Sequence, residues 1–100
     1  MDIQKETKTQ ITMKNKLLCY DNGGATRDRY TIMPPKSAFE YRQNDGTYLC
    51  LACDESPYHP LGIGMSATGT HGKHLGKRIQ FNVLPSDVKR LSQLFFPMFC

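Results

Sequence analysis

The sequence predicts a small α+β domain, in which a mostly antiparallel sheet of four to five strands is packed by one C-terminal helix. The first observation is that turn-forming residues at 21–24 and 44–46 separate short runs rich in aliphatic, β-branched and aromatic residues. The second is that apolar residues near the end of the chain recur at helical spacing, and these are Val88, Leu91, Leu94 and Phe95. The helix is expected to cover the open face of the sheet.

Four of the strands are expected to form two hairpins. Runs at 16–20 and 29–33 flank the first turn, where Asn and Gly accept a positive φ and Asp can bond its own downstream backbone. A short run at 38–42 and the apolar run at 48–53 flank the second turn. The run at 48–53 is the most apolar, so we expect it to be the central strand.

The remaining elements are predicted from breakers and caps. Residues 54–72 are predicted to be a long loop, because their prolines and glycines disfavour a regular element. Residues 79–83 follow as a short strand. The helix is expected from about residue 85 to residue 96, with a Ser or Asp side chain satisfying its first free N–H groups.

The two ends of the chain differ in composition. Residues 1–14 are polar and lack a usable period, so we expect a flexible N-terminal extension before a single domain at 15–100. Residues 95–100 are strongly apolar. Two interpretations stay open for this tail, since it could fold back on the body or join two copies of the chain in a homodimer.

The charge balance suits an anionic partner. The chain has 100 residues, a net charge of +4 and a sequence pI of about 9.0. Five basic residues give the last thirty residues a positive charge, against which Asp87 is the one acidic residue. No apolar stretch reaches the length of a membrane span, and the N-terminal residues form no hydrophobic signal core. We therefore expect a cytoplasmic protein with no membrane partner.

The most informative stretch is residues 71–78, which read HGKHLGKR. Glycine lets a backbone approach a ligand closely, while Lys and Arg supply charge and donors, and Arg can grip a phosphate or carboxylate with two bonds. The spacing is not that of a P-loop, and a solvated basic turn before a strand is the alternative interpretation. The candidate binding residues in this basic Gly-rich loop are His71, Lys73, His74, Lys77 and Arg78.

Three further candidate binding residues lie outside the loop. Tyr58 is an aromatic residue that could stack on a ligand beside the cations, and His59 could act as a proton donor or acceptor. Arg29 follows Asp28 at a strand entrance, where the two are expected to form a surface ion pair. In the alternative interpretation, Asp28 orients Arg29 toward a ligand.

A zinc site can be weighed from the cysteines. Cys50 and Cys53 form a C-x-x-C, and with His71 and His74 they could supply four ligands. On a strand, however, residues three apart point to opposite faces, and no glycine knuckle lies between these two. We therefore expect buried cysteines that behave as small apolar residues, and no metal, cofactor or catalytic residue.

Two passages together resemble a family of small uncharacterised proteins of bacteriophages and prophages. They are CYDNGGATRDRYT at 19–31 and GKHLGKRI at 72–79, the latter followed by LPSDV at 84–88. The segment HPLG at 59–62 lies between them in a similar place, and the resemblance covers roughly residues 18–90. It implies a phage or mobile-element origin, a small accessory role and a location in the host cell. The C-x-x-C is not part of the pattern, and the family brings no established activity.

The leading functional hypothesis is a non-enzymatic binding module whose basic loop takes an anionic partner. That partner is a host protein complex such as a defence complex, a nucleic acid or a nucleotide. One alternative is a small enzyme that uses His and Cys chemistry, with Cys53 as nucleophile, although no nucleophile-elbow, metallohydrolase or nucleotide motif is present. Another is a structural or oligomerising protein, for which the apolar tail is the motive.

Overall fold

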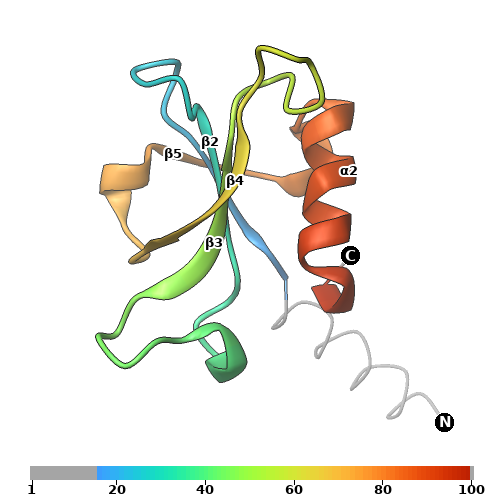
Figure 1. Cartoon of the computed structure of the whole chain (residues 1–100). Coiled ribbons are helices and arrows are strands. Elements are labelled where there is room, and N and C mark those ends of the chain that lie inside the picture. Colours follow the sequence, from blue (N-terminus) through green and yellow to red (C-terminus); the bar gives the residue numbers. More distant parts are fainter. Residues whose placement is uncertain (1–15, 100) are drawn as a thin grey trace, which may run out of the picture.

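The computed structural model describes residues 16–99 and confirms the predicted α+β architecture (Figure 1). Five antiparallel strands form one sheet in the order β4-β3-β2-β1-β5, and α2 (Ser86–Phe95) packs on one of its faces. The strands are β1 (Leu18–Asp21), β2 (Tyr30–Met33), β3 (Tyr48–Cys53), β4 (Gly64–Gly69) and β5 (Lys77–Ile79). The predicted N-terminal extension lies outside the described residues.

The face of the sheet beneath α2 is buried from solvent. Cys19, Ile32 and Leu51 are direct neighbours across β1, β2 and β3, and each is at most 1% exposed. From the helix side, Val88 and Phe96 pack against them and are fully buried. Burying one such aliphatic or aromatic side chain contributes roughly 1.5–3 kcal/mol, so this interface holds the helix to the sheet.

The predicted helix is confirmed, but its details differ from the prediction. No side chain caps its N-terminus, where Pro85 precedes the first turn. Leu94, predicted to face the core, is 69% exposed, and Ser92 lies fully buried instead. Ser92 is four residues after Val88 and therefore lies on the same helix face, and its hydroxyl donates to the Val88 carbonyl at 2.7 Å, which satisfies the buried polar group.

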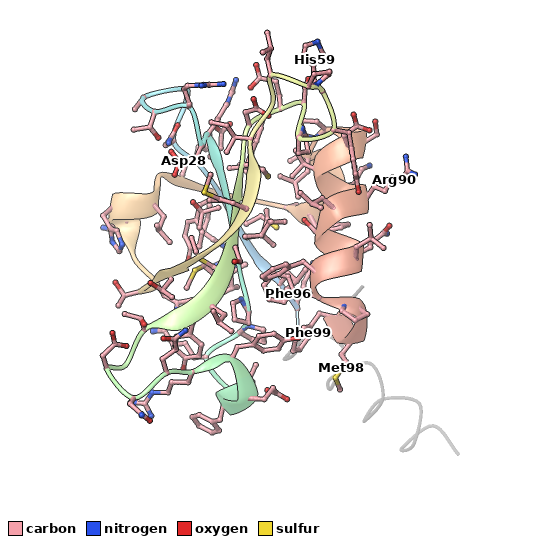
Figure 2. All side chains as sticks on the ribbon, viewed as in Figure 1. Asp28, His59, Arg90, Phe96, Met98 and Phe99 are labelled. Atoms are coloured by element: carbon pink, nitrogen blue, oxygen red, sulfur yellow. The ribbon has the colours of Figure 1, made fainter. Side chains whose placement is uncertain are left out.

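The apolar tail folds back on the body of the domain. Phe96 is fully buried and meets the Tyr41 ring edge-on, with 5.2 Å between ring centroids. Phe99 lies 5.9 Å from the same Tyr41 ring, whereas Met98 points outward and is 77% exposed (Figure 2). Of the two interpretations left open by the sequence, internal packing is the one that the structure shows for these two phenylalanines.

Two of the predicted strand segments are wrong in part. The run at 38–42 is a 3-10 turn, η1 (Phe39–Tyr41), and only one bridge, between Arg42 and Tyr48, joins its end to β3. The turn forms because the Pro35 carbonyl accepts the Ala38 N–H and starts a tight bend. The run at 79–83 is a strand only to Ile79 and continues as the 3-10 turn η3 (Phe81–Val83).

The predicted long loop at 54–72 contains a strand that the sequence did not disclose. Within that range, residues 54–63 and 70–72 are irregular, and β4 between them pairs with the whole of β3. Glycine is tolerated here because β4 is an edge strand. At Gly64 a Cβ would lie 2.7 Å from Leu91 Cδ2 of the helix, so a larger residue would require that side chain to shift. The predicted central strand, β3, therefore lies one place from the centre, which β2 occupies.

The chain must cross the sheet once more to complete this topology. Strands β4 and β5 form opposite edges, so residues 70–76, which join them, run over the face that α2 leaves open. Figure 1 shows this crossing segment, in light orange, on the side away from the helix. Leu75 anchors it, because its side chain packs in a second cluster with Tyr20, Met33, Tyr48 and Cys50.

Candidate functional site

The crossing segment borders a hollow that collects three of the predicted binding residues. This basic hollow has a volume of about 530 Å³ and a largely apolar lining. Its cations are exposed, so their charged groups are hydrated and face solvent. The residues that line it are Tyr20, Gly72, Lys73, Gly76, Lys77 and Arg78.

Backbone geometry places the cations around this hollow. The segment makes one 3-10 turn, η2 (Lys73–Leu75), before β5 begins at Lys77. Gly76 separates the two elements with φ +113°, and a Cβ there would collide with the Asp21 carbonyl at the end of β1. Only glycine combines that dihedral angle with such a close approach. Gly76 therefore fixes the path of the loop where it meets β1.

Arg78 and Lys77 are oriented by their neighbours on β1. The Arg78 guanidinium lies over the Tyr20 ring, 5.9 Å from its centroid, in a cation–π arrangement. Lys77 is the direct register partner of Asp21. Within residues 16–99, neither these two side chains nor Lys73 forms an ion pair, although the Lys77 charge helps to lower the pKa of Asp21. The hollow therefore carries three cations that form no salt bridge.

The ion pair of Arg29 differs from the prediction. Its guanidinium grips Asp21 with two bonds, Nε to Oδ1 at 2.8 Å and Nη2 to Oδ2 at 3.1 Å, whereas Asp28 accepts the Thr26 hydroxyl. The reason is hairpin register, because Asp21 pairs with Tyr30 and so lies beside Arg29 across the turn. The hydrogen bond from Arg29 holds the pKa of Asp21 below its ordinary value. Arg29 therefore lies outside the basic hollow.

The two histidines of the loop have different surroundings. His71 Nε2 lies 2.7 Å from the Pro34 carbonyl, and its ring meets Tyr48 edge-on at 4.8 Å. His74 is exposed and folds back over Gly72, with Nδ1 only 2.9 Å from where a Cβ of Gly72 would lie. Neither imidazole lines the basic hollow, so the hollow is built from Lys and Arg alone among the predicted cations and imidazoles.

His71 lines a second, smaller hollow on the other side of the crossing segment. This side hollow has a volume of about 250 Å³. Two of its residues, Lys36 and Arg42, are cations that the sequence did not single out, and no local motif could have found them, since they are brought together by the long-range fold. The residues that line it are Lys36, Arg42, Gly46, Tyr48, Thr70 and His71.

Tyr58 and His59 lie away from both hollows. The Tyr58 ring packs under Arg90 of α2, with the guanidinium carbon 5.1 Å from its centroid. His59 accepts the backbone N–H of Leu61 at 3.0 Å through Nδ1. Figure 2 shows His59 and Arg90 on the helix side of the molecule, whereas the crossing segment lies on the opposite side. The structure therefore does not bring these two predicted residues to the basic loop.

The cysteines lie as a strand assignment requires. Cys53 packs in the core under α2 and Cys50 in the cluster on the other face, so their sulfurs diverge. Burial raises the pKa of the Cys53 thiol to about 12, which leaves it protonated and unsuited to nucleophilic attack at neutral pH. Within residues 16–99, His, Cys, Asp and Glu side chains do not gather in threes around a metal-sized space.

Comparison with known proteins gives no family assignment. No protein-family model, no curated protein and no solved structure matches this chain. Across residues 16–99, no helix has the length and apolarity needed to cross a membrane. Function is therefore inferred from the side chains and their arrangement.

Proposed function

We propose that the protein is a non-enzymatic binding module that takes an anionic partner in the basic hollow. The partner is a nucleic acid, a nucleotide or an acidic face of a host protein complex. The observation that carries this proposal is that Lys73, Lys77 and Arg78 surround one concave, largely apolar space without forming an ion pair within residues 16–99. The resemblance to phage proteins supports a mobile-element origin and a place of action in the host cytoplasm.

The electrostatics of the hollow favour the binding of an anion over the alternative that the loop is only a solvated basic turn. Three like charges repel one another, and the nearest carboxylate, Asp21, already accepts two bonds from Arg29. A bound anion would relieve that repulsion and add charge-assisted hydrogen bonds. Gly72 and Gly76 also line the hollow.

A titration with defined anionic probes tests the proposal. The probes are a fluorescent oligothymidylate of roughly 12 nucleotides, within the 4–16 that small single-strand-binding domains cover, labelled ATP, and a labelled poly-Glu peptide. The test variant replaces Lys73, Lys77 and Arg78 by Ala. Its control replaces Lys16, Lys89 and Arg90 by Ala. This variant also loses two lysines and one arginine, but from positions outside both hollows.

The expected result is that at least one probe binds and that the hollow variant loses most of this affinity while the control variant keeps it. The affinity should also fall as salt rises, because exposed charges are screened within about 8–10 Å at physiological ionic strength. Equal binding by wild type and hollow variant at every salt concentration, or no binding of any probe at low salt, would refute the proposal. A pull-down from host lysate, with and without nuclease, then sorts nucleic acid from protein partners.

A further inference from the structure

We propose that the basic hollow and the side hollow form one continuous binding track for single-stranded nucleic acid. This inference rests on the proposed function and narrows its partner to one chemical class. The track runs over the face of the sheet opposite α2, along both sides of the crossing segment (residues 70–76). It adds Lys36 and Arg42, which lie outside the basic loop, to the binding residues.

The two hollows are neighbours on one surface. Tyr20 of β1 belongs to the basic hollow and Tyr48 of β3 to the side hollow, and both side chains pack in the same cluster on the face away from α2. Only β2 separates their strands, but Tyr20 lies level with Ala52, four residues along β3 from Tyr48. The two tyrosines are therefore about 16 Å apart at the usual strand spacing and rise. Consecutive residues of the crossing segment connect them, because His71 lines one hollow and Gly72 the other.

The charge along this surface has one sign where a ligand would lie. The exposed cations Lys36 and Arg42 line one end and the three cations of the basic hollow line the other. The hollows themselves contain no carboxylate among their lining residues. Nearby, Asp21 is paired with Arg29, whereas Asp45 accepts the backbone N–H and the hydroxyl of Thr47 and keeps its negative charge. A chain with an anionic group every few ångströms matches this spacing, whereas a mononucleotide fills only one end.

The shapes of the hollows favour a nucleic-acid strand over an acidic peptide. The basic hollow combines an apolar lining with a cationic rim, which fits a base with its attached phosphate, while a carboxylate side chain would leave the apolar lining unfilled. Its volume of about 530 Å³ lies in the range of pockets for single small molecules. It therefore admits one nucleotide unit and excludes a duplex, whose bases remain stacked and paired.

The test separates the two ends of the track. Lys36→Ala combined with Arg42→Ala removes the cations of the side hollow, and the control is Lys89→Ala combined with Arg90→Ala on the helix, with the same loss of charge on the other face of the sheet. Each protein is titrated with the oligothymidylate of roughly 12 nucleotides and with thymidine monophosphate. Thermal denaturation checks that each variant folds. If the Ala variant of Lys36 and Arg42 melts at a lower temperature than wild type, Lys36→Gln combined with Arg42→Gln is used in its place.

We expect the side-hollow variant to bind the oligonucleotide about tenfold more weakly, through two lost charged contacts, and to bind the monophosphate like wild type. The loss of two phosphate contacts also makes the affinity of the variant less sensitive to salt. The ratio of wild-type to variant affinity should therefore fall about sevenfold between about 50 and about 200 mM salt. The control should behave like wild type with both ligands.

Three outcomes would overturn the track. If the side-hollow variant binds the oligonucleotide like wild type while the variant of Lys73, Lys77 and Arg78 loses it, the track is wrong and the proposed function stands. If the same sequence in duplex form binds at least as tightly, or if only poly-Glu binds, the ligand is not a single strand. If neither variant affects any binding, the proposed function fails as well.

Discussion

The two faces of the sheet are built differently. Under α2, neighbouring strands present Cys19, Ile32 and Leu51 to a helix that leaves no exposed gap over them. On the other face a single irregular segment crosses the sheet and Leu75 alone of η2 packs into the cluster below. The two hollows lie open to solvent beside this segment. One face of the same strands is thus closed by the helix, and the other carries the hollows that we propose to bind a partner.

The largest effect should come from the helix face. Replacing Phe96 by Ala removes a fully buried ring and should cost about 3–5 kcal/mol of unfolding free energy. Urea denaturation followed by circular dichroism measures it. The control is Met98→Ala two residues later, where the side chain is 77% exposed and the change should stay within about 0.5 kcal/mol. Similar losses for the two variants would contradict the assignment of the tail to the core.

A substitution in the crossing segment should have an intermediate effect on the free energy of unfolding. Gly76→Ala meets both a φ of +113° and a collision with the Asp21 carbonyl, and should cost about 1–3 kcal/mol. Gly23→Ala is the matched control, since Gly23 also has a positive φ of 75° but nothing lies within 4 Å of its added Cβ. The excess for Gly76 in the same urea experiment measures the collision. Equal losses would show that the segment can move off the sheet.

A smaller effect is expected from the ion pair beside the hollow. The pKa of Asp21 is lowered in the folded state, chiefly by its hydrogen bond from Arg29. The contribution of this ion pair to the free energy of unfolding is therefore fully present above pH 3.8, the ordinary pKa of Asp. It is lost as the pH falls through the lower pKa of Asp21 in the folded state. Arg29→Gln should lower the melting temperature near neutral pH, and the difference from wild type should narrow in acid.

Arg27→Gln serves as the control for this pH dependence, because Arg27 donates to the uncharged backbone carbonyl of Leu61. Its difference from wild type should stay constant over the same pH range. A difference for Arg29→Gln that also stays constant would mean that Asp21 is not the partner that stabilises the fold.

The smallest effect on stability should come from the hollow itself. Replacing Lys73, Lys77 and Arg78 by Ala should change the unfolding free energy by no more than about 0.5 kcal/mol, since all three side chains are exposed and lack ion pairs within residues 16–99. The same urea titration measures it. A large loss would show that this face, too, is structural, and would remove the contrast between the two faces.

The parts of the fold that could be predicted are those with a regular pattern of side chains. The run at 48–53 and the helix at Ser86–Phe95 were predictable because each buries a continuous apolar face. Strand β4 reads GMSATG and lies at an edge, so its apolar pattern is limited to Met65 and Ala67, between glycines that do not favour a strand. Its existence depends on pairing with β3, which a local pattern does not contain.

The candidate site divides in the same way. The cations at 73, 77 and 78 are close in sequence, so their gathering in one hollow could be expected from the loop alone. Lys36 and Arg42 reach the side hollow only because the long-range fold brings residue 71 beside them. The partner of Arg29 depends on hairpin register, since Asp21 pairs with Tyr30. The predicted runs at 16–20 and 29–33 leave Asp21 in the turn, so adjacency in sequence favours Asp28 instead.

The pairing of β5 with β1 has a consequence for how the protein matures. Strands β1 to β4 are joined by successive hairpins, whereas residue 77 must return to residue 21 across most of the domain. Closing so long a loop costs more chain entropy than closing a hairpin, so it is expected to come late in folding. A nascent chain emerging from the ribosome would hold a four-stranded sheet in which β1 is still an edge. The hollow that we propose to bind a partner would then be complete only after synthesis has passed β5.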